Sequence, residues 1–243
     1  MSIQHRRAVL FIHGILGTPN HFAPFVSLVP SGWSICNIKL KGHCGGVKDF
    51  SRATMAEWKS QVQYALAELL KEHDRIIIAA HSMGTLFAIQ EAIKNPVAEL
   101  FLLNVPLRIR VTPQLFQTAW KIWWEKNDPD DERLLAAQTA YSIERDRHIL
   151  RYFGWLPRYL ELFAEIRETR KLVEKLSVPS HIYFSVQDEM VSPKSHMLLE
   201  DNAFVTVKTL KKSGHFYYSP DDRSLLIEDF REMIQNADVL GEH

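Results

Sequence analysis

The chain has 243 residues, which is enough for one large α/β domain or for one domain that carries an inserted cap. Nearly half of its residues are apolar, so it can bury a sizeable core, and this composition excludes a mainly disordered chain. Lysine plus arginine and aspartate plus glutamate balance at 29 each, so the net charge offers no field that would hold nucleic acid or an anionic membrane.

The N-terminal segment carries two arginines before an apolar run, as a short export signal would. The run ends at His13 after only five residues, which is too short for the core of a signal peptide and suits a buried strand over residues 8–13. No uninterrupted apolar stretch approaches the length of a membrane span. Cys36 and Cys44 are the only cysteines, too few for a disulfide framework. We therefore expect a soluble cytoplasmic protein.

Short apolar runs alternate with longer helical patterns, which predicts βαβ units around a mostly parallel sheet. After the first strand, Thr18 as N-cap and Pro19 as first helical residue predict a helix over residues 18–29. Residues 54–73 have apolar side chains at helical spacing and predict a long amphipathic helix. The other expected elements are strands at residues 33–40, 75–80, 99–106, 181–187 and 205–211, and helices after residue 82 and at residues 193–200 and 223–234.

Between residues 107 and 177 the pattern changes to helices without a convincing strand. Such an insert between two strands of an α/β sheet is expected to cover the carboxyl ends of the strands, where open sheets bind ligands. We therefore predict a core of residues 1–106 and 178–243 and a helical cap of residues 107–177. Any one of its tryptophans is more simply a packing residue, although the group as a whole could line a pocket. The helical patterns lie at residues 113–126, 131–150 and 156–176, and the tryptophans are Trp120, Trp123, Trp124 and Trp155.

Residues 75–92 place Ser82 between an apolar strand and a helix, which is the layout of a nucleophile elbow. The usual elbow reads Gly-x-Ser-x-Gly, and here Ala80 stands at the first glycine position while Gly84 keeps the second. A serine hydroxyl is a weak nucleophile that needs a histidine base oriented by a carboxylate. Taken alone, Ser82 could equally be an N-cap of the following helix.

A carboxylate and a histidine follow later strands in the chain order that this arrangement requires. Asp188 follows one strand, and we expect the neighbouring Glu189 to point elsewhere because successive side chains near a strand end face opposite ways. His215 follows the last strand. The simpler alternatives are a turn cap for Asp188 and a solvated turn histidine for His215. Less suitable positions are occupied by His81, His148, His181, His196 and His243.

A site for acyl transfer also needs two backbone N–H groups that bind the developing oxyanion. Met83 lies at the start of the helix after Ser82, and Ile15, in the loop after the first strand, is the expected second donor. The pair His43 and Cys44 invites a metal interpretation, but no second pair of ligands stands at metal spacing. We therefore expect no metal site.

Five short motifs, FIHGILG, KGHCGG, AHSMG, DEMVSP and SGH, follow one another along the chain. Together they resemble the α/β-hydrolase fold, and more closely the small bacterial carboxylesterases related to monoacylglycerol lipases. The resemblance implies hydrolysis of carboxylic esters of short to medium acyl chains through an acyl intermediate on Ser82, without a cofactor. Cys44, Ala80, Thr85 and Ile15 depart from the family pattern, and none of these changes removes a catalytic group.

The fold hosts many chemistries, so the same three residues would also serve a thioesterase, a lactonase, a carbon–carbon bond hydrolase or an acyltransferase. A non-catalytic ligand-binding protein on this scaffold is a further alternative, against which the complete set of Ser82, Asp188 and His215 argues. We expect a small-molecule ester as the substrate, with no nucleic acid partner and no integral membrane association. The natural substrate and the oligomeric state do not follow from the sequence.

Overall fold

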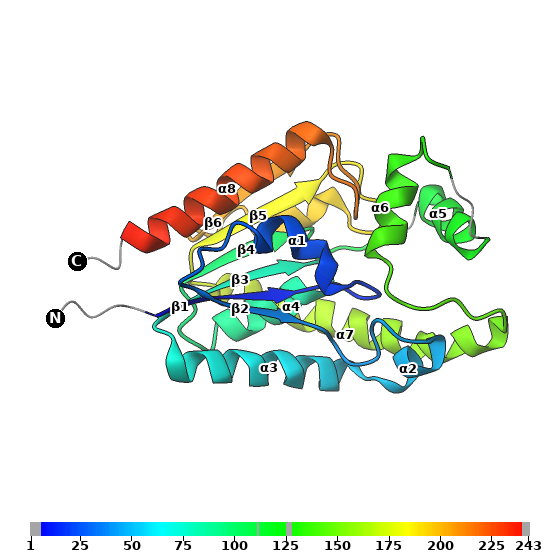
Figure 1. Cartoon of the computed structure of the whole chain (residues 1–243), viewed down its shortest axis with the longest axis horizontal. Coiled ribbons are helices and arrows are strands. Elements are labelled where there is room, and N and C mark those ends of the chain that lie inside the picture. The colour runs from blue at the N-terminus through cyan, green and yellow to red at the C-terminus, as the bar shows by residue number, and fades with distance from the viewer. Residues whose placement is uncertain (1–5, 111, 125–127, 240–243) are drawn as a thin grey trace.

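The computed structural model describes residues 6–110, 112–124 and 128–239, and its centre is a six-stranded sheet (Figure 1). All neighbouring strands pair in parallel, in the order β2-β1-β3-β4-β5-β6. The expected α/β fold with a parallel central sheet and flanking helices is thus confirmed. The strands are β1 (Arg7–Ile12), β2 (Ser34–Ile38), β3 (Arg75–His81), β4 (Glu99–Leu103), β5 (Ser180–Ser185) and β6 (Val205–Leu210).

Helices cover both faces of the sheet, with α1 and α8 on one side and α3 and α7 on the other (Figure 1). The helices before β4 are η1 (Pro19–Phe22), α1 (Ala23–Val26), α2 (Val47–Arg52), α3 (Met55–Glu72) and α4 (Met83–Ala92). Those after β4 are α5 (Pro113–Trp123), α6 (Glu132–Ala140), η2 (Ile149–Trp155), α7 (Leu156–Leu172), η3 (Val173–Lys175), η4 (Pro193–Leu198) and α8 (Pro220–Val239).

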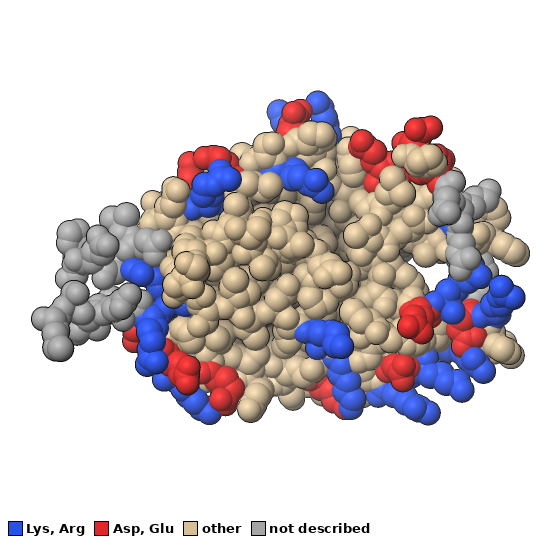
Figure 2. Space-filling view, viewed as in Figure 1, with Lys and Arg blue, Asp and Glu red and all other residues tan. Residues whose placement is uncertain are grey.

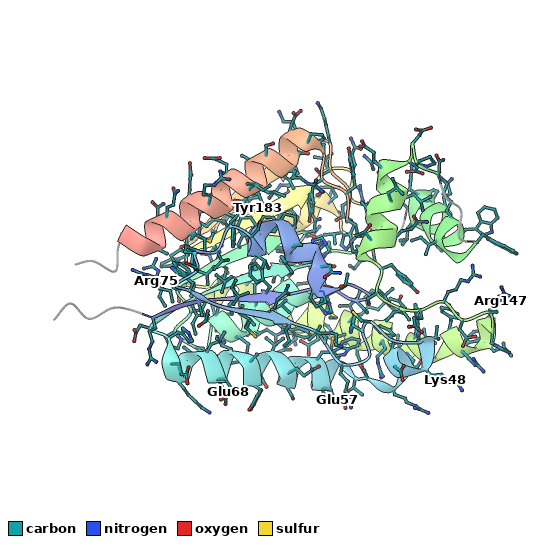
Figure 3. The ribbon with its side chains drawn as sticks, in the orientation of Figure 1. Lys48, Glu57, Glu68, Arg75, Arg147 and Tyr183 are labelled. Carbon is teal, nitrogen blue, oxygen red and sulfur yellow. The ribbon has the colours of Figure 1, made fainter. Side chains whose placement is uncertain are left out.

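The central strands are apolar without alternation because both of their faces are covered. Successive side chains of β1 point to opposite faces, so Leu10 and Ile12 join one core cluster while Val9 and Phe11 join the other. The second cluster includes Tyr183 of β5, whose hydroxyl donates to Asp229 Oδ2 of α8 at 2.7 Å (Figure 3). β1 therefore contributes to the cores on both faces of the sheet, and a hydrogen bond ties β5 to α8 on one of them.

The long helix α3 begins as its sequence predicts. Thr54 Oγ1 accepts from the N–H of Glu57 at 3.2 Å, and Glu57 Oε2 accepts from the N–H of Thr54 at 2.9 Å, which together form a capping box. Glu68 points away from the sheet in Figure 3, as the amphipathic pattern requires. The predicted helix over residues 54–73 is confirmed within one residue at each end.

The predicted helix over residues 18–29 is wrong in extent, because the structure has only the 3-10 turn η1 and the single α turn α1. Thr18 caps this segment as expected, with its hydroxyl accepting from the N–H of Asn20 at 3.2 Å. Pro24 lacks an N–H, so the hydrogen bond that would carry one helix through the segment cannot form. The predicted helix at residues 193–200 is likewise a 3-10 helix over residues 193–198.

The pattern over residues 131–150 predicts one helix, but α6 ends at Ala140. Beyond it, the N–H of Ser142 donates to the carbonyl of Leu16 at 2.9 Å, and the N–H of Glu144 donates to that of Gly45 at 2.9 Å. These bonds to the loops after β1 and β2 replace the helical bonds, so tertiary contacts override the local pattern. In the predicted helix of residues 113–126, α5 ends at Trp123, and residues 125 and 126 lie outside the described part.

The described residues between β4 and β5 form helices and no strand. Figure 1 places α5 and α6 beyond the carboxyl ends of the strands. Helix α7, in contrast, packs against α4 beside the sheet, where Gln90 of α4 donates to Thr169 Oγ1 of α7 at 2.8 Å. Trp155 is buried and its indole N–H donates to the carbonyl of Val47 at 3.2 Å, which is a packing role. Trp120 and Trp124 are exposed, and the side chain of Trp123 lies outside the described part. The division into core and cap stays a prediction.

Charged side chains of both signs lie side by side around the rim of the face shown in Figure 2, while its centre carries few of them. This arrangement agrees with the balanced composition. None of the helices in the described ranges is long and apolar enough to cross a membrane.

Candidate active site

Ser82 stands at the sharp turn between β3 and α4. Its backbone has φ 50° and ψ −124°, a left-handed φ that costs a non-glycine residue about 1–3 kcal/mol and needs support from its surroundings. The N–H of Ser82 donates to the carbonyl of Leu103 at the end of β4, at 2.9 Å. The hydroxyl of Thr85 donates to the carbonyl of Ser82 at 2.6 Å. Thr85, which departs from the family pattern, therefore helps to hold the turn.

Asp188 and His215 form a buried pair at the carboxyl ends of β5 and β6. His215 Nδ1 lies 2.7 Å from Asp188 Oδ2, and both side chains are 2 % exposed or less. Because a carboxylate only accepts, His215 Nδ1 carries the proton and Nε2 is left as a base. The other carboxylate oxygen, Oδ1, accepts from the N–H groups of Met190 at 2.7 Å and Val191 at 2.6 Å. The backbone of the loop after β5 thereby holds the carboxylate of Asp188, which in turn orients the imidazole of His215.

Two opposing effects act on the pKa of His215. Burial lowers it, while the charge of Asp188 and the hydrogen bond to Asp188 raise it, and the net result is a pKa above the ordinary value of 6.5. The charge of Asp188 thus stabilises the imidazolium form of His215 in its buried position. This is the property required of a histidine that takes a proton during a reaction.

His81, the residue before Ser82, contacts the loop after β6 that carries His215. The ring of His81 lies 4.8 Å from the ring of His215, and His81 Nε2 donates to the carbonyl of His215 at 3.0 Å. Ser82 is almost completely buried, being 5 % exposed. The loops of Ser82, Asp188 and His215, far apart in the sequence, therefore meet at one edge of the sheet.

The loop after β1 passes directly beside Ser82. A Cβ atom on Gly14 would lie 2.9 Å from the Cβ of Ser82, so only glycine allows this approach. Ile15, the next residue, is buried, and Met83 is the first residue of α4, where an N–H has no acceptor within its own helix. The two expected oxyanion donors thus belong to the segments that flank Ser82.

His13, directly after β1, has a fully buried, neutral imidazole. Its Nδ1–H donates to the carbonyl of Gly14 at 2.9 Å, and its Nε2 accepts from the N–H of Leu40 at 3.2 Å. Burial lowers the pKa of His13 to about 4. His43 packs edge-on against it with ring centres 4.7 Å apart, and burial lowers the pKa of His43 to about 3. Both rings therefore support the loop after β1 in uncharged form.

The pair His43 and Cys44 does not converge on a common point, since His43 is buried beside Trp58 and Cys44 is exposed. Across the described ranges, no group of three or more His, Cys, Asp or Glu side chains is arranged to hold a metal ion.

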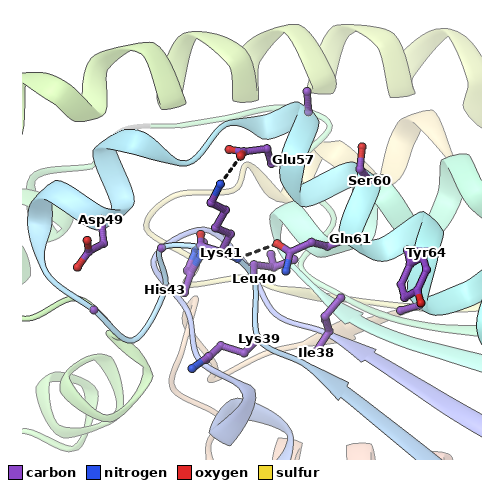
Figure 4. A pocket seen from close by; sticks show the side chains of 14 residues that line it. Ile38, Lys39, Leu40, Lys41, His43, Asp49, Glu57, Ser60, Gln61 and Tyr64 are labelled. Carbon is purple, nitrogen blue, oxygen red and sulfur yellow. Dashed lines mark hydrogen bonds and ion pairs between the residues drawn. The ribbon is translucent and has the colours of Figure 1, made fainter.

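A surface pocket of about 1020 Å³ lies between the end of β2 and α3, and His43 is one of the residues that line it (Figure 4). Gln61 Oε1 accepts from the N–H of Lys41 at 2.7 Å there, and the Lys41 ammonium pairs with Glu57. The residues that line the pocket include neither Ser82 nor His215. It is therefore a hollow beside the edge strand and not the centre of the candidate active site.

Two side chains that contact the main chain of His215 were not predicted from the sequence. Asn104, directly after β4, donates through Nδ2 to the carbonyl of His215 at 3.3 Å. Glu189 accepts from the N–H of His215 at 2.9 Å, so the expectation that it points elsewhere is wrong. A polar residue inside the predicted strand of residues 99–106, close to the ligand-binding edge, was the available signal for Asn104. Nothing local in the sequence predicts the contact of Glu189 with a residue 26 positions away.

The fold and these loops define an α/β hydrolase, and the comparison with known families agrees. The model of the alpha/beta hydrolase family matches residues 9–226, so the chain belongs to this family. A curated relative, the thermostable monoacylglycerol lipase of Bacillus sp. (strain H-257), is 22% identical over 232 residues, which cover 90% of this chain and 87% of the relative.

Solved structures share the fold at low sequence identity. A metagenome-derived lipolytic enzyme superposes with a TM-score of 0.72 at 20% identity, covering 97% of this chain and 96% of its own. The monoacylglycerol lipase of Paleococcus ferrophilus gives a TM-score of 0.67 at 16% identity, with 94% of each chain covered.

Proposed function

We propose that the protein is a serine hydrolase that cleaves carboxylic esters of short to medium acyl chains, as a carboxylesterase or monoacylglycerol lipase does. The observation that carries the proposal is the buried 2.7 Å hydrogen bond between Asp188 and His215, at the sheet edge where Ser82 occupies a strained turn. The monoacylglycerol lipase among the curated relatives supports the choice of ester substrates.

In the first half of the proposed reaction, the Oγ of Ser82 attacks the ester carbonyl while Nε2 of His215 takes its proton. Asp188 stabilises the imidazolium that forms, because its carboxylate accepts from the Nδ1–H. The tetrahedral oxyanion is bound by the N–H groups of Ile15 and Met83. Collapse of the intermediate releases the alcohol, which receives the proton from His215, and leaves an acyl-serine.

In the second half, His215 removes a proton from water, and the resulting hydroxide attacks the acyl-serine. The same two N–H groups bind the second oxyanion, and His215 returns the proton to Ser82. Every proton in this cycle passes through one imidazole, so no step in it requires a metal or another cofactor. We propose that the protein carries out this reaction in the cytoplasm.

The surface of the predicted cap, residues 107–177, favours a substrate with an apolar acyl group. Its helices expose large apolar side chains to an unusual extent for a soluble surface, where such residues are normally scattered singly. We propose that part of this surface receives the acyl chain on its way to Ser82. The exposed residues are Phe116, Trp120, Trp124, Leu135, Ile149, Leu150, Phe153, Leu156, Leu160 and Phe163.

A substrate panel tests the proposal. Purified protein is assayed on p-nitrophenyl esters of increasing chain length, monoacylglycerols, lactones and acyl-thioesters, with the variant Ser82→Ala as the blank. We expect turnover of esters with a maximum at short to medium chains. Turnover of thioesters alone, or of lactones alone, would replace the ester assignment with the corresponding alternative.

A further inference from the structure

Both polar groups of the main chain of His215 are bonded by side chains from three other loops. The N–H of His215 donates to Glu189 Oε2 at 2.9 Å. Its carbonyl oxygen accepts from His81 Nε2 at 3.0 Å and from Asn104 Nδ2 at 3.3 Å. Because a carbonyl only accepts, Nε2 of His81 carries the proton. The histidine is thus held at its backbone as well as at its ring.

The three side chains connect the histidine to the other loops of the candidate active site. His81 directly precedes Ser82, and Glu189 directly follows Asp188. Asn104 directly follows β4 and has φ 53°, and its Oδ1 accepts from the N–H of Ser185 at the end of β5, at 2.9 Å. Each contact therefore couples the position of His215 to that of a neighbouring strand end.

We propose that His81, Asn104 and Glu189 are positioning residues that hold the main chain of His215, so that its ring keeps the distance to Ser82 that proton transfer needs. The inference rests on the proposed function, because it concerns the histidine that this function uses. Proton transfer tolerates little displacement, and an error of about 1 Å in such a site can lower the rate by a factor on the order of 100. The hydrogen bond to Asp188 fixes the tautomer of the imidazole. The hydrogen bonds to the main chain fix the position of the backbone from which the imidazole extends.

Glu189 allows the sharpest test, because its carboxylate provides both a hydrogen-bond acceptor and a charge. Glutamine keeps an acceptor oxygen at the same reach and removes only the charge. Alanine removes both. Burial lowers the pKa of His215, Asp188 raises it, and the charge of Glu189 raises it further, so both variants lower this pKa while only Glu189→Ala releases the main chain.

The experiment measures kcat, KM and the pH profile of kcat/KM on a p-nitrophenyl ester for the wild type, Glu189→Gln and Glu189→Ala. We expect Glu189→Ala to lose a factor of about 10 or more in kcat with little change in KM. Glu189→Gln should recover most of that loss, and both variants should shift the acidic limb of the profile to lower pH. Glu228→Ala, at an exposed carboxylate of α8, serves as the matched control.

Equal kcat values for Glu189→Ala and the wild type would overturn the proposal, as would a loss in Glu189→Ala that Glu189→Gln fails to recover. A second pair, His81→Gln and His81→Leu, repeats the test at the carbonyl, where glutamine can still donate. If the wild type hydrolyses no ester, the proposed function fails while the positioning role is still tested by NMR. Recorded at a pH at which His215 is neutral in all three proteins, the low-field resonance of its Nδ1 proton should change in Glu189→Ala and stay in Glu189→Gln, and an unchanged resonance in both variants contradicts the role.

Discussion

Gly84 lies against the backbone of Ile12, and this contact sets how closely α4 crosses β1. A Cβ atom on Gly84 would come within 2.3 Å of the carbonyl oxygen of Ile12 and within 2.8 Å of that of His13. Both neighbours are backbone atoms of a buried strand end, which cannot move aside as a flexible side chain could. The second glycine of the elbow is therefore a requirement of packing.

The two small residues around Ser82 should respond differently to substitution. Gly84→Ala should destabilise the fold by about 1–3 kcal/mol through overpacking and should greatly reduce activity. Ala80→Gly only removes a buried methyl group from β3 and should leave activity largely unchanged, at a cost in stability on the order of 1 kcal/mol. Urea unfolding and ester turnover measure both effects. A large change of activity in Ala80→Gly would show that the methyl group itself shapes the elbow.

Asp188→Asn tests the pair with His215. An amide can donate as well as accept, so it no longer dictates the tautomer, and it cannot stabilise the imidazolium. We expect kcat to fall by roughly four orders of magnitude while the protein still folds. The pKa of His215 should also fall, because Asp188 is its main raising influence. Retention of kcat within tenfold would mean that another carboxylate serves His215.

The buried neutral histidines make the free energy of unfolding depend on pH. Burial holds the pKa of His13 at about 4 and that of His43 at about 3, whereas in the unfolded chain both return to about 6.5. A depressed pKa in the folded state contributes stability that is fully present above about pH 6.5 and is lost as the pH falls toward 4, because only the unfolded state binds protons there. His215 has the opposite sign and partly offsets the loss.

Urea unfolding at pH 8, 7, 6 and 5 measures this dependence. The free energy of unfolding should fall between pH 7 and 5 by about 2 kcal/mol for each buried neutral histidine, less the offset from His215. His43→Phe should reduce the slope, since the ring packs among Phe50 and Trp58 and its Nε2 has no partner. A flat profile would contradict the neutral, buried state of these rings.

Arg158 anchors α7 to the turn between α2 and α3. Its guanidinium is buried and donates to the carbonyls of Ser51, at 3.0 Å, and Ala53, and to Glu161 Oε1 at 2.7 Å. Arg158→Ala leaves these carbonyls without their donor and should cost about 2–4 kcal/mol in thermal unfolding. Arg167→Ala on the exposed face of α7 should cost less than 1 kcal/mol, as surface changes usually do. Equal losses would show that the anchor does not stabilise the fold.

The strands were predictable from the sequence because sheet burial on both faces produces apolar runs such as residues 75–80, with few competing interpretations. Helix α3 was predictable for a similar reason, since its capping box and amphipathic face agree. The errors arose where a proline or a tertiary contact overrides the helical pattern. Pro24 interrupts the helix after β1, and the contacts of Ser142 and Glu144 with distant loops end the helix before them.

For the candidate site, chain order predicted Ser82, Asp188 and His215, because each follows a strand and parallel strands end at the same edge. The hydrogen bond of Asp188 with His215 was thereby anticipated. The contacts of Asn104 and Glu189 with the main chain of His215 were not, since they depend on how three loops fold over one another. Spacing along the chain carries no information about such contacts.

Covalent labelling of Ser82 tests the central claim most directly. The wild-type protein is incubated with a fluorophosphonate probe, which reacts with a serine that is activated by a neighbouring base, and the modified peptide is identified by mass spectrometry. The account predicts one modified residue, Ser82, and no labelling or ester turnover in Ser82→Ala. Labelling or turnover that persists in Ser82→Ala would contradict it.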